Sequence, residues 1–337
     1  MNICLISDFS GNLDEGMKVV GESLAKELVK THHVLRVDVH KAIGCDVWCK
    51  LIEFNPDVLH YTSGPSPLSF IILRTLALVY KTKSGRNVKT VMSATQPRLP
   101  FGCARLLENL KPDILLVQSR ENEEYFGRIG FDVKYLPNGV DIKKFLPSNE
   151  RRKKDLRVKY GLREDRFVVL HVGSIRANRG LDALKSVANM TDCLVLIVGA
   201  TSTPAEPKVI SDLIGSGCTV WRKYVQSINE IYQLADLYVF PVEEKLGCIE
   251  IPLSVLEAMS CNLPIISTRF RGLPGLFTEG DGLFFVDNRS EISNVVKNIK
   301  SGRNLVSVQT RAKVMPYSWN NVTNVLSQYY LQLIYKE

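Results

Sequence analysis

Short apolar runs alternate with helix-periodic segments along most of the sequence. In the first part of the chain, runs typical of strands cover residues 2–7, 34–39, 57–60, 88–93, 114–118 and 133–136. Amphipathic patterns typical of helices cover residues 16–30, 68–81 and 120–129. Strands that are apolar on both faces and separated by helices are typical of βαβ units around a buried parallel sheet. The pattern therefore predicts an α/β fold.

The alternation stops between residues 136 and 155 and then starts again. The interruption joins the turn residues Pro137-Asn138-Gly139 to the charge run Arg151-Arg152-Lys153-Lys154, which is typical of a linker followed by a solvated helix start. The later strands are expected at residues 167–172, 194–198, 220–221, 237–240, 264–267 and 283–286, and the later helices at residues 181–189, 253–260 and 291–299.

A chain of 337 residues has room for about two domains. We therefore predict two doubly wound, Rossmann-like domains with parallel sheets, over residues 1–146 and 147–318, and a last amphipathic helix over about residues 319–337. Parallel sheets of this kind bind ligands outside the carboxyl ends of their strands. The expected binding site is a cleft between the two domains.

The charge balance favours an anionic partner. Lys and Arg number 43 against 35 Asp and Glu, a formal net charge of +8, which suits a nucleic acid, an acidic membrane face or a phosphorylated ligand. The cations are dispersed and no basic motif is interleaved with aromatic residues, so a nucleic acid is not expected. The composition is that of a globular protein.

The eight cysteines form no C-x-x-C pair and do not cluster with the five histidines. We expect reduced, mostly buried thiols, no metal site and a cytoplasmic protein without a targeting segment. The oligomeric state is not predicted.

Three segments near expected strand ends suit a phosphorylated ligand. Gly16 opens the first helix, where free N–H groups favour an anion, although a flexible surface loop is the alternative. Gly173-Ser174 ends a buried strand and precedes Arg176 and Arg179, whose guanidinium groups suit a diphosphate; two solvated loop arginines are the alternative. Glu257 lies on an apolar helix, where a carboxylate needs donors such as ribose hydroxyls; an exposed helix glutamate is the alternative.

The order of these segments resembles the retaining glycosyltransferases of family 4, which have the GT-B fold. The resemblance covers nearly the whole chain and rests on the Gly16 loop, residues 137–141 with Phe145 and Pro147, residues 172–182, residues 231–241, residues 256–259 and Ser318-Trp319. It implies an enzyme of the EC 2.4 class that moves a hexosyl or related group from a nucleoside diphosphate sugar to a hydroxyl acceptor with retention of configuration. It implies no metal and no other cofactor.

The resemblance also implies roles for individual residues. Arg179, with Arg176, would neutralise the leaving diphosphate, Glu257 would hold the ribose, and Glu250 would meet the donor sugar. The other donor-binding positions implied are Gly16, Gly173, Ser174, Ile251, Pro252 and Leu253. The first domain would bind the acceptor, and the last helix would return to it.

The acceptor side is expected to include His60, Ser93, Thr95 and Gln96. His60 ends an expected strand and is interpreted either as a residue that touches substrate or as a structural histidine. His171 lies inside a strand and is expected in the core.

Several positions depart from the family's pattern. Seven residues usually separate its two glutamates, but Ile249 occupies the expected position before Glu257, so Glu250 is taken as the substitute. Ser174 replaces the usual arginine, with Arg176 as its stand-in. Residues 91–96 lack a histidine that many members carry, and Gly275 replaces a commonly acidic residue. These departures motivate a second hypothesis, a protein that holds a nucleotide sugar or a partner without catalysis.

A basic stretch accompanies the apolar helix expected at residues 68–81. Its cations are Arg74, Lys81, Lys83, Arg86 and Lys89. This pattern fits peripheral contact with an anionic membrane surface at the cytosolic face. The alternative is that the apolar face of the helix packs on the sheet and the cations are solvated.

Overall fold

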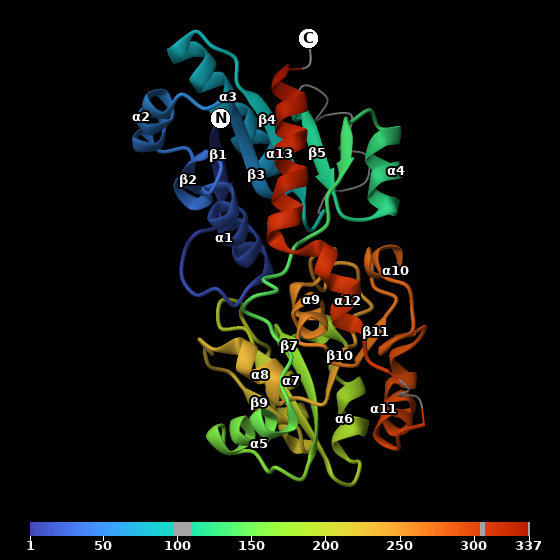
Figure 1. Ribbon diagram of the computed structural model, residues 1–337. Coiled ribbons are helices and arrows are strands. Elements are labelled where there is room, and N and C mark those ends of the chain that lie inside the picture. Colours follow the sequence, from blue (N-terminus) through green and yellow to red (C-terminus); the bar gives the residue numbers. More distant parts are fainter. Residues whose placement is uncertain (98–109, 304–306, 336–337) are drawn as a thin grey trace. The chain divides into compact units, whose positions relative to one another are not determined.

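The computed structural model describes residues 1–97, 110–303 and 307–335, and it contains two compact units (Figure 1). Unit 1 consists of Met1–Gly139, Ile249–Ile251 and the chain from Trp319 onward, and unit 2 consists of Val140–Cys248 and Pro252–Ser318. Residues 140–146, which the sequence assigned to the first domain, therefore belong to unit 2. Cys103 lies outside the described residues.

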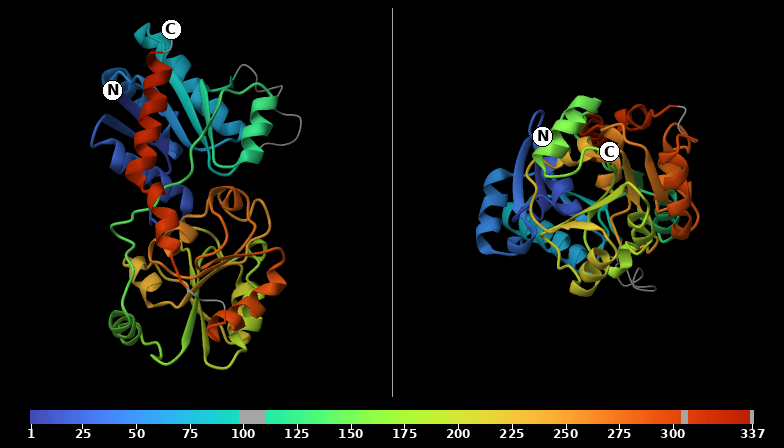
Figure 2. Two further views of the ribbon diagram at one scale, coloured as in Figure 1. Left: turned by 45° about the vertical axis from the view of Figure 1, so that its right-hand side comes forward. Right: turned by 90° about the horizontal axis from the view of Figure 1, so that it is seen from below.

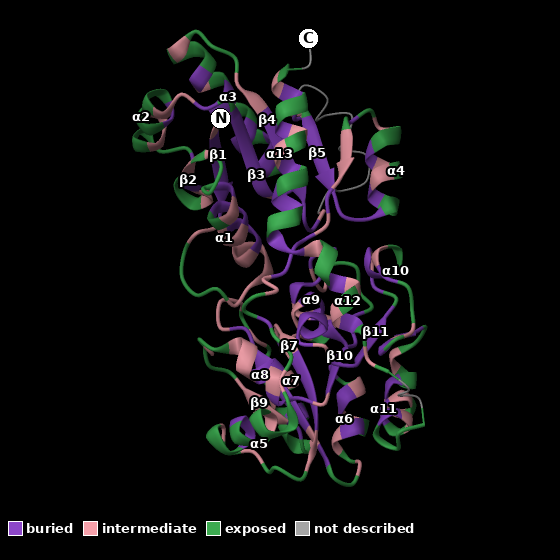
Figure 3. Ribbon diagram, viewed as in Figure 1, coloured by how far each residue is buried: buried purple, intermediate pink, exposed green. Residues whose placement is uncertain are grey.

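Unit 1 is built on a six-stranded parallel sheet with the strand order β2-β1-β3-β4-β5-β6. Its strands are β1 (Asn2–Ser7), β2 (His33–Asp38), β3 (Val58–Gly64), β4 (Lys89–Ala94), β5 (Ile114–Val117) and β6 (Val133–Tyr135). Its helices are α1 (Gly16–Leu28), α2 (Cys45–Phe54), α3 (Pro67–Ser84), α4 (Arg120–Arg128) and α13 (Trp319–Tyr335). The central strands are buried (Figure 3), as expected for strands covered by helices on both faces.

The last helix, α13, returns to unit 1. It packs against α1, and Figure 2 shows it, in red, along the sheet of this unit. The Tyr329 hydroxyl donates to the Tyr135 carbonyl at 3.1 Å, and Gly139 leaves room for Trp319, since a Cβ at Gly139 would lie 2.6 Å from the indole ring. These contacts hold the first residue of the helix and its second half against unit 1.

Close packing between α1 and the sheet depends on Gly21. A Cβ at this position would lie 1.9 Å from the Ser7 hydroxyl oxygen, and Ser7 is itself buried and accepts a 2.7 Å hydrogen bond from Thr62. Gly21→Ala is therefore expected to lower the free energy of unfolding of unit 1 by about 1–3 kcal/mol through overpacking, measured by urea denaturation.

Gly127→Ala is the matched control for Gly21→Ala. Gly127 lies in α4 with nothing within 4 Å of an added Cβ, so alanine there is expected to stabilise the protein by about 0.5–1 kcal/mol. Equal stability of the Gly21→Ala variant and the unmodified protein would show that α1 can move away from the sheet without cost.

Unit 2 has a second six-stranded parallel sheet, with the order β12-β11-β10-β7-β8-β9. Its strands are β7 (Phe167–Gly173), β8 (Cys193–Gly199), β9 (Thr219–Trp221), β10 (Leu237–Phe240), β11 (Ile265–Thr268) and β12 (Leu283–Val286). Its helices are α5 (Glu150–Lys159), α6 (Ala183–Ala188), α7 (Pro207–Gly215), α8 (Ile228–Leu234), α9 (Leu253–Ser260), α10 (Leu273–Leu276), α11 (Ile292–Lys300) and α12 (Thr310–Val314). The predicted α/β class and the parallel sheets are confirmed.

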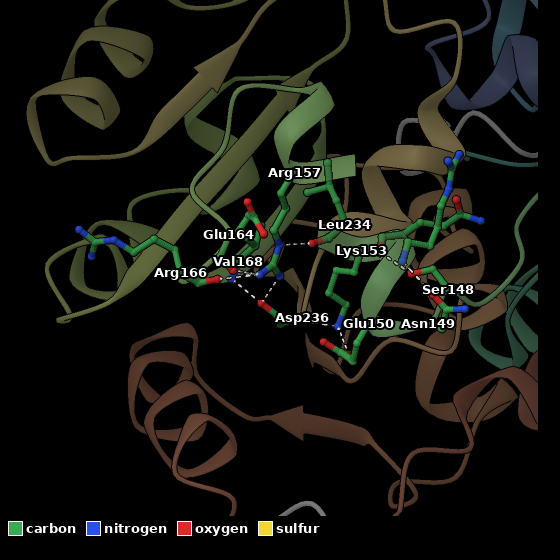
Figure 4. A network of polar contacts seen from close by, with 12 residues as sticks. Ser148, Asn149, Glu150, Lys153, Arg157, Glu164, Arg166, Val168, Leu234 and Asp236 are labelled. Atoms are coloured by element: carbon green, nitrogen blue, oxygen red, sulfur yellow. Dashed lines mark hydrogen bonds and ion pairs between the residues drawn. The ribbon is translucent and has the colours of Figure 1, made fainter. Parts of the chain in front are cut away.

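A buried arginine joins α5 to the sheet of unit 2 (Figure 4). Arg157 donates to the carbonyls of Leu234, Glu164 and Arg166 at 2.9–3.1 Å and to the Asp236 carboxylate at 2.6 Å. Lys153 adds a 3.0 Å contact to Asp236. The cations of residues 151–154, read from the sequence as a solvated helix start, are thus partly used to hold α5 in place.

The described cysteines are free thiols. Cys4, Cys193, Cys218 and Cys261 are buried and Cys248 is half-buried, whereas Cys45 and Cys49 are exposed on α2. The described thiols are thus mostly buried, as expected. Within the described part of the chain, no helix has both the length and the apolarity that crossing a membrane requires.

Candidate nucleotide-binding site

The turn that follows β7 places an arginine at the carboxyl end of the unit 2 sheet. β7 ends at Gly173, and a short 3-10 helix, Ala177–Arg179, leads to Gly180. Gly180 has a φ of +66°, and a Cβ there would lie 2.4 Å from the Pro241 carbonyl oxygen. Glycine is therefore required at this position both by the left-handed backbone and by the close approach of β10.

The Arg179 side chain is 4% exposed. One terminal nitrogen, Nη1, donates to the Gly247 carbonyl at 2.6 Å, and the guanidinium carbon lies 5.8 Å from the centre of the Phe240 ring. Its Nε finds no hydrogen-bond partner among the described residues, and no described carboxylate forms an ion pair with it. A buried cation without a counter-charge is costly unless a ligand supplies one.

Gly173 and His171 flank this guanidinium. A Cβ at Gly173 would lie 2.3 Å from Nη2 of Arg179 and 3.3 Å from Nε2 of His171, so only glycine leaves the guanidinium in place. His171 is buried, as predicted, and its Nδ1 donates to the Val239 carbonyl at 2.9 Å. Burial, reinforced by the charge of Arg179, lowers the pKa of His171 to about 3, which keeps the imidazole neutral.

Ser174 and Arg176 are half-buried in the same turn. The Arg176 Nε donates to the Pro204 carbonyl at 3.0 Å, which directs part of its guanidinium toward the loop that follows β8. The structure therefore holds Arg176 through a different partner from Arg179, and any contact with a diphosphate would come from its remaining nitrogens.

Glu257 lies on α9, whose other residues are largely buried. The Tyr232 hydroxyl donates to one carboxylate oxygen at 2.7 Å. Burial raises the pKa of Glu257, while the Tyr232 hydrogen bond and the charge of Lys144 oppose that rise. The adjoining Pro252 and Leu253, which open the helix, are also buried. The carboxylate is thus fixed by Tyr232, a partner that the sequence did not reveal.

The short segment Ile249–Ile251 is held by unit 1. The Glu250 backbone N–H donates to the Thr95 carbonyl at 2.8 Å, and the Asn138 side-chain amide donates to the Ile251 carbonyl at 2.7 Å. Glu250 is 1% exposed. Glu250 was predicted to contact the sugar donor, and Thr95 was predicted to lie on the side of the sugar acceptor. The structure joins these two residues through their backbones.

Gly16, at the start of α1, faces the same segment, because a Cβ there would lie 3.0 Å from the Ile249 side chain. The preceding Glu15 accepts a hydrogen bond from the Lys18 backbone at 3.3 Å. One of the backbone N–H groups that the helix start leaves without a partner inside the helix therefore already donates to a carboxylate. Gln96, the next predicted acceptor residue along from Thr95, is buried.

His60 lies in the interior of unit 1, fully buried. Its Nδ1 is 2.5 Å from the Tyr330 hydroxyl on α13, and its Nε2 is 2.7 Å from the Ser93 hydroxyl on β4. Burial lowers the pKa of His60 to about 3. Both nitrogens are engaged and no ring atom is exposed, so the geometry supports the structural interpretation of His60 over contact with substrate.

The two buried histidines predict an acid-sensitive fold. Below pH 6.5 the unfolded chain binds a proton at each histidine, whereas the folded chain does so only near pH 3. Each therefore lowers the free energy of unfolding by about 1.4 kcal/mol per pH unit as the pH falls through this window. Denaturant unfolding at about pH 6.5 and pH 5 measures the loss, and His60→Gln and His171→Gln should each remove part of it. A stability that does not change over this range would contradict the assignment of neutral, buried imidazoles.

No group of three or more His, Cys, Asp or Glu side chains able to hold a metal ion occurs among the residues that the structure describes.

Known glycosyltransferases are similar to this chain in sequence and in fold. Residues 166–301 match a family model described as glycosyl transferases group 1. A sulfoquinovosyl transferase of Arabidopsis thaliana is 25% identical over 86% of this chain and 59% of its own length. A D-inositol 3-phosphate glycosyltransferase of Paenarthrobacter aurescens is 26% identical over 68% of this chain and 60% of its own length. The chain thus spans about three-fifths of these curated relatives.

Solved structures match almost the whole chain. A glycosyltransferase of Rickettsia africae has a TM-score of 0.79 at 13% identity, covering 100% of this chain and 99% of its own. The Anabaena HepE protein in complex with UDP-glucose has a TM-score of 0.74 at 14% identity, covering 97% of this chain and 100% of its own. At these identities the likeness shows the fold, which is the predicted GT-B fold.

Proposed function

We propose that this chain, which has the GT-B fold and whose residues 166–301 match a family model described as glycosyl transferases group 1, transfers a glycosyl group from a nucleoside diphosphate sugar to a hydroxyl acceptor with retention of configuration. The relatives named above are glycosyltransferases, and HepE binds UDP-glucose. The donor base, the sugar and the acceptor of this chain are left open by the proposal.

The buried Arg179 carries the proposal. Its guanidinium is 4% exposed and has no carboxylate partner among the described residues. It lies at the carboxyl end of β7, where sheets of this type bind ligands. A diphosphate would supply the missing counter-charge and accept hydrogen bonds from the terminal nitrogens and Nε. The same cation would stabilise the negative charge that builds up on the diphosphate as it leaves.

Glu257 is proposed to accept hydrogen bonds from the ribose hydroxyls of the donor. Tyr232 occupies one of its carboxylate oxygens, which fixes the side chain and leaves acceptor capacity for a ligand. In the roles implied by the resemblance, Ser174, Pro252 and Leu253 complete the donor contacts in unit 2. The resemblance also implies donor-binding roles for Gly16, Glu250 and Ile251, which belong to unit 1.

The proposed reaction needs no metal ion. The acceptor hydroxyl attacks the anomeric carbon on the face from which the diphosphate leaves, so configuration is retained. The bond between the anomeric carbon and the phosphate oxygen breaks, and a leaving phosphate oxygen takes the proton of the hydroxyl. Arg179 balances the charge of that phosphate. No protein carboxylate acts as the base in this scheme.

Nucleotide binding tests the donor half of the proposal. We expect one of the nucleoside diphosphates UDP, GDP and ADP to raise the melting temperature, since a ligand that binds only the folded state stabilises it. CMP, which has a single phosphate, should not do so. Glu257→Gln should weaken binding of that nucleotide but leave binding of its 2′,3′-dideoxy form unchanged. Tyr232→Phe is the matched control, because it frees the carboxylate without removing it. Equal losses for both nucleotides in Glu257→Gln would contradict the ribose contact, and no stabilisation by any nucleotide would contradict the donor assignment.

A further inference from the structure

Helix α3 has large apolar side chains on two opposite faces. One face packs on the sheet of unit 1 and buries Phe70, Leu73, Leu76, Ala77 and Tyr80. On the other face Leu68 is 63% exposed, Ile71 is 51% exposed and Leu78 is 48% exposed. A surface helix normally presents polar residues on its outer face, so this outer apolar stripe needs its own explanation. Figure 3 shows α3 with exposed segments along its outer side.

The spacing of these residues makes the stripe continuous. Leu68, Ile71, Thr75, Leu78 and Thr82 follow one another at intervals of three and four residues, which places them in one row on an α-helix. We call this row the α3 stripe. Two of its five members are threonines. Their methyl groups add apolar surface between the larger side chains, although each threonine also carries a hydroxyl.

Cations border the α3 stripe. Arg74 and Lys81 are exposed and seven residues apart, so they lie on the same edge of the stripe, about two turns apart along the helix. Lys83 and Arg86 are exposed at the end of the helix. The segment Pro67–Ser84 contains no Asp or Glu, and no described carboxylate forms an ion pair with Arg74, Lys81 or Lys83. The positive charge of this face is therefore not neutralised within the described structure.

We propose that the α3 stripe docks on an anionic lipid surface, with α3 lying in the plane of the interface. Leu68, Ile71 and Leu78 would enter the boundary between headgroups and acyl chains, and Arg74, Lys81 and Lys83 would contact lipid phosphates. A second copy of this chain fits the face poorly. A two-fold contact would bring the same row of cations from both copies together, whereas an anionic surface complements it. The inner face of α3 packs on the sheet, and the lipid contact is proposed for the outer face.

Vesicle co-sedimentation of the full chain, without any sugar donor, tests this surface independently of the proposed transferase activity. We expect binding to vesicles that contain phosphatidylglycerol and little binding to vesicles of phosphatidylcholine alone. Raising the salt from about 0.1 M to about 1 M should weaken binding, because the screening length falls from about 10 Å to about 3 Å. Arg74→Gln, Lys81→Gln and Lys83→Gln should each lower the binding constant about fivefold, the factor that about 1 kcal/mol per cation represents.

Two matched sets of variants separate the α3 stripe from general surface properties. Leu68→Ser/Ile71→Ser/Leu78→Ser should lose at least about tenfold in vesicle binding. The control variant removes apolar side chains of similar exposure from unit 2, through Leu146→Ser/Val158→Ser/Ile214→Ser. It should bind vesicles as the unmodified protein does. A second control removes three exposed cations from unit 2, through Arg151→Gln/Lys154→Gln/Lys208→Gln. It shows how much vesicle binding depends on net charge alone.

The same variants show which outcomes overturn the proposal. Equal binding by the stripe variant and its unit 2 control would do so, and so would equal binding to both kinds of vesicle. Sedimentation velocity adds a third arm. A dimer that the stripe substitutions dissociate, found together with no vesicle binding, would assign the face to a second copy and contradict the lipid assignment.

Discussion

Replacing Arg179 with alanine is expected to lower kcat about 10²–10³-fold, the usual cost of removing one preorganised donor to a developing negative charge. The guanidinium is the buried, unneutralised cation at the end of β7, so its loss removes the charge that would balance the leaving diphosphate. Turnover of the donor with and without acceptor measures the effect. Arg179→Lys should recover only part of the activity, because an ammonium cannot make the paired contacts of a guanidinium.

The fold should survive this substitution. Arg179 has no described carboxylate partner, so its removal leaves no buried counter-charge behind, and only the Gly247 carbonyl loses a donor. The free energy of unfolding should change by no more than about 1 kcal/mol. Arg163→Ala, at an exposed arginine paired with Asp165, is the control for loss of a cation. An Arg179→Ala protein with near-normal kcat would contradict the assigned role, whatever its stability.

Replacing Arg157 with alanine is expected to cost about 3–5 kcal/mol of stability, the range for breaking a buried charge pair. Three carbonyls would lose their donor and Asp236 would lose its closest cation. Arg157→Lys should restore little, because one ammonium cannot reach four acceptors spread over the end of α8, Asp236 before β10 and the 164–166 loop. Guanidinium chloride unfolding measures the loss.

Lys153→Ala is a milder substitution in the same network of contacts around Asp236. It removes the 3.0 Å contact to Asp236 and the 3.1 Å contact to the exposed Glu150 and should cost about 1 kcal/mol or less, so it gives a measurable value even if the Arg157→Ala protein does not fold. A loss below about 1 kcal/mol for Arg157→Ala would show that water replaces the guanidinium and that the network is not structural.

The positions of the strands were predictable because buried parallel strands consist of apolar, often β-branched residues in short runs. Residues 2–7, 237–240 and 283–286 were placed at their observed bounds. The helices α2, α7 and α8 were missed. None of them has a side-chain hydrogen bond at its N-cap. The N-cap residues of α2 and α7 are Gly44 and Glu206, which are weak start signals, and Ser227 precedes α8 without capping it. Their positions depend on packing against the rest of each unit.

The candidate site was predictable where glycine and arginine spacing follows a strand, as at Gly173 and Arg179. Partners from distant segments were not predictable. Gly247 supplies the carbonyl that holds Arg179, Tyr232 fixes Glu257, and Asn138 holds Ile251. None of these pairs is close in sequence, and only the fold brings them together. His60 illustrates the reverse case. It was expected at a strand end, but β3 continues to Gly64, and His60 lies in the core with both nitrogens engaged.

Product formation from a panel of labelled nucleoside diphosphate sugars tests the central claim most directly. The purified chain is incubated with each donor and a mixture of hydroxyl acceptors, and the anomeric configuration of the first product is read by NMR. We predict transfer from at least one donor with the configuration retained, and its loss in Arg179→Ala. A chain that binds a nucleotide sugar but transfers nothing would contradict the enzymatic claim and favour the non-catalytic hypothesis, and an inverted product would contradict the proposed chemistry.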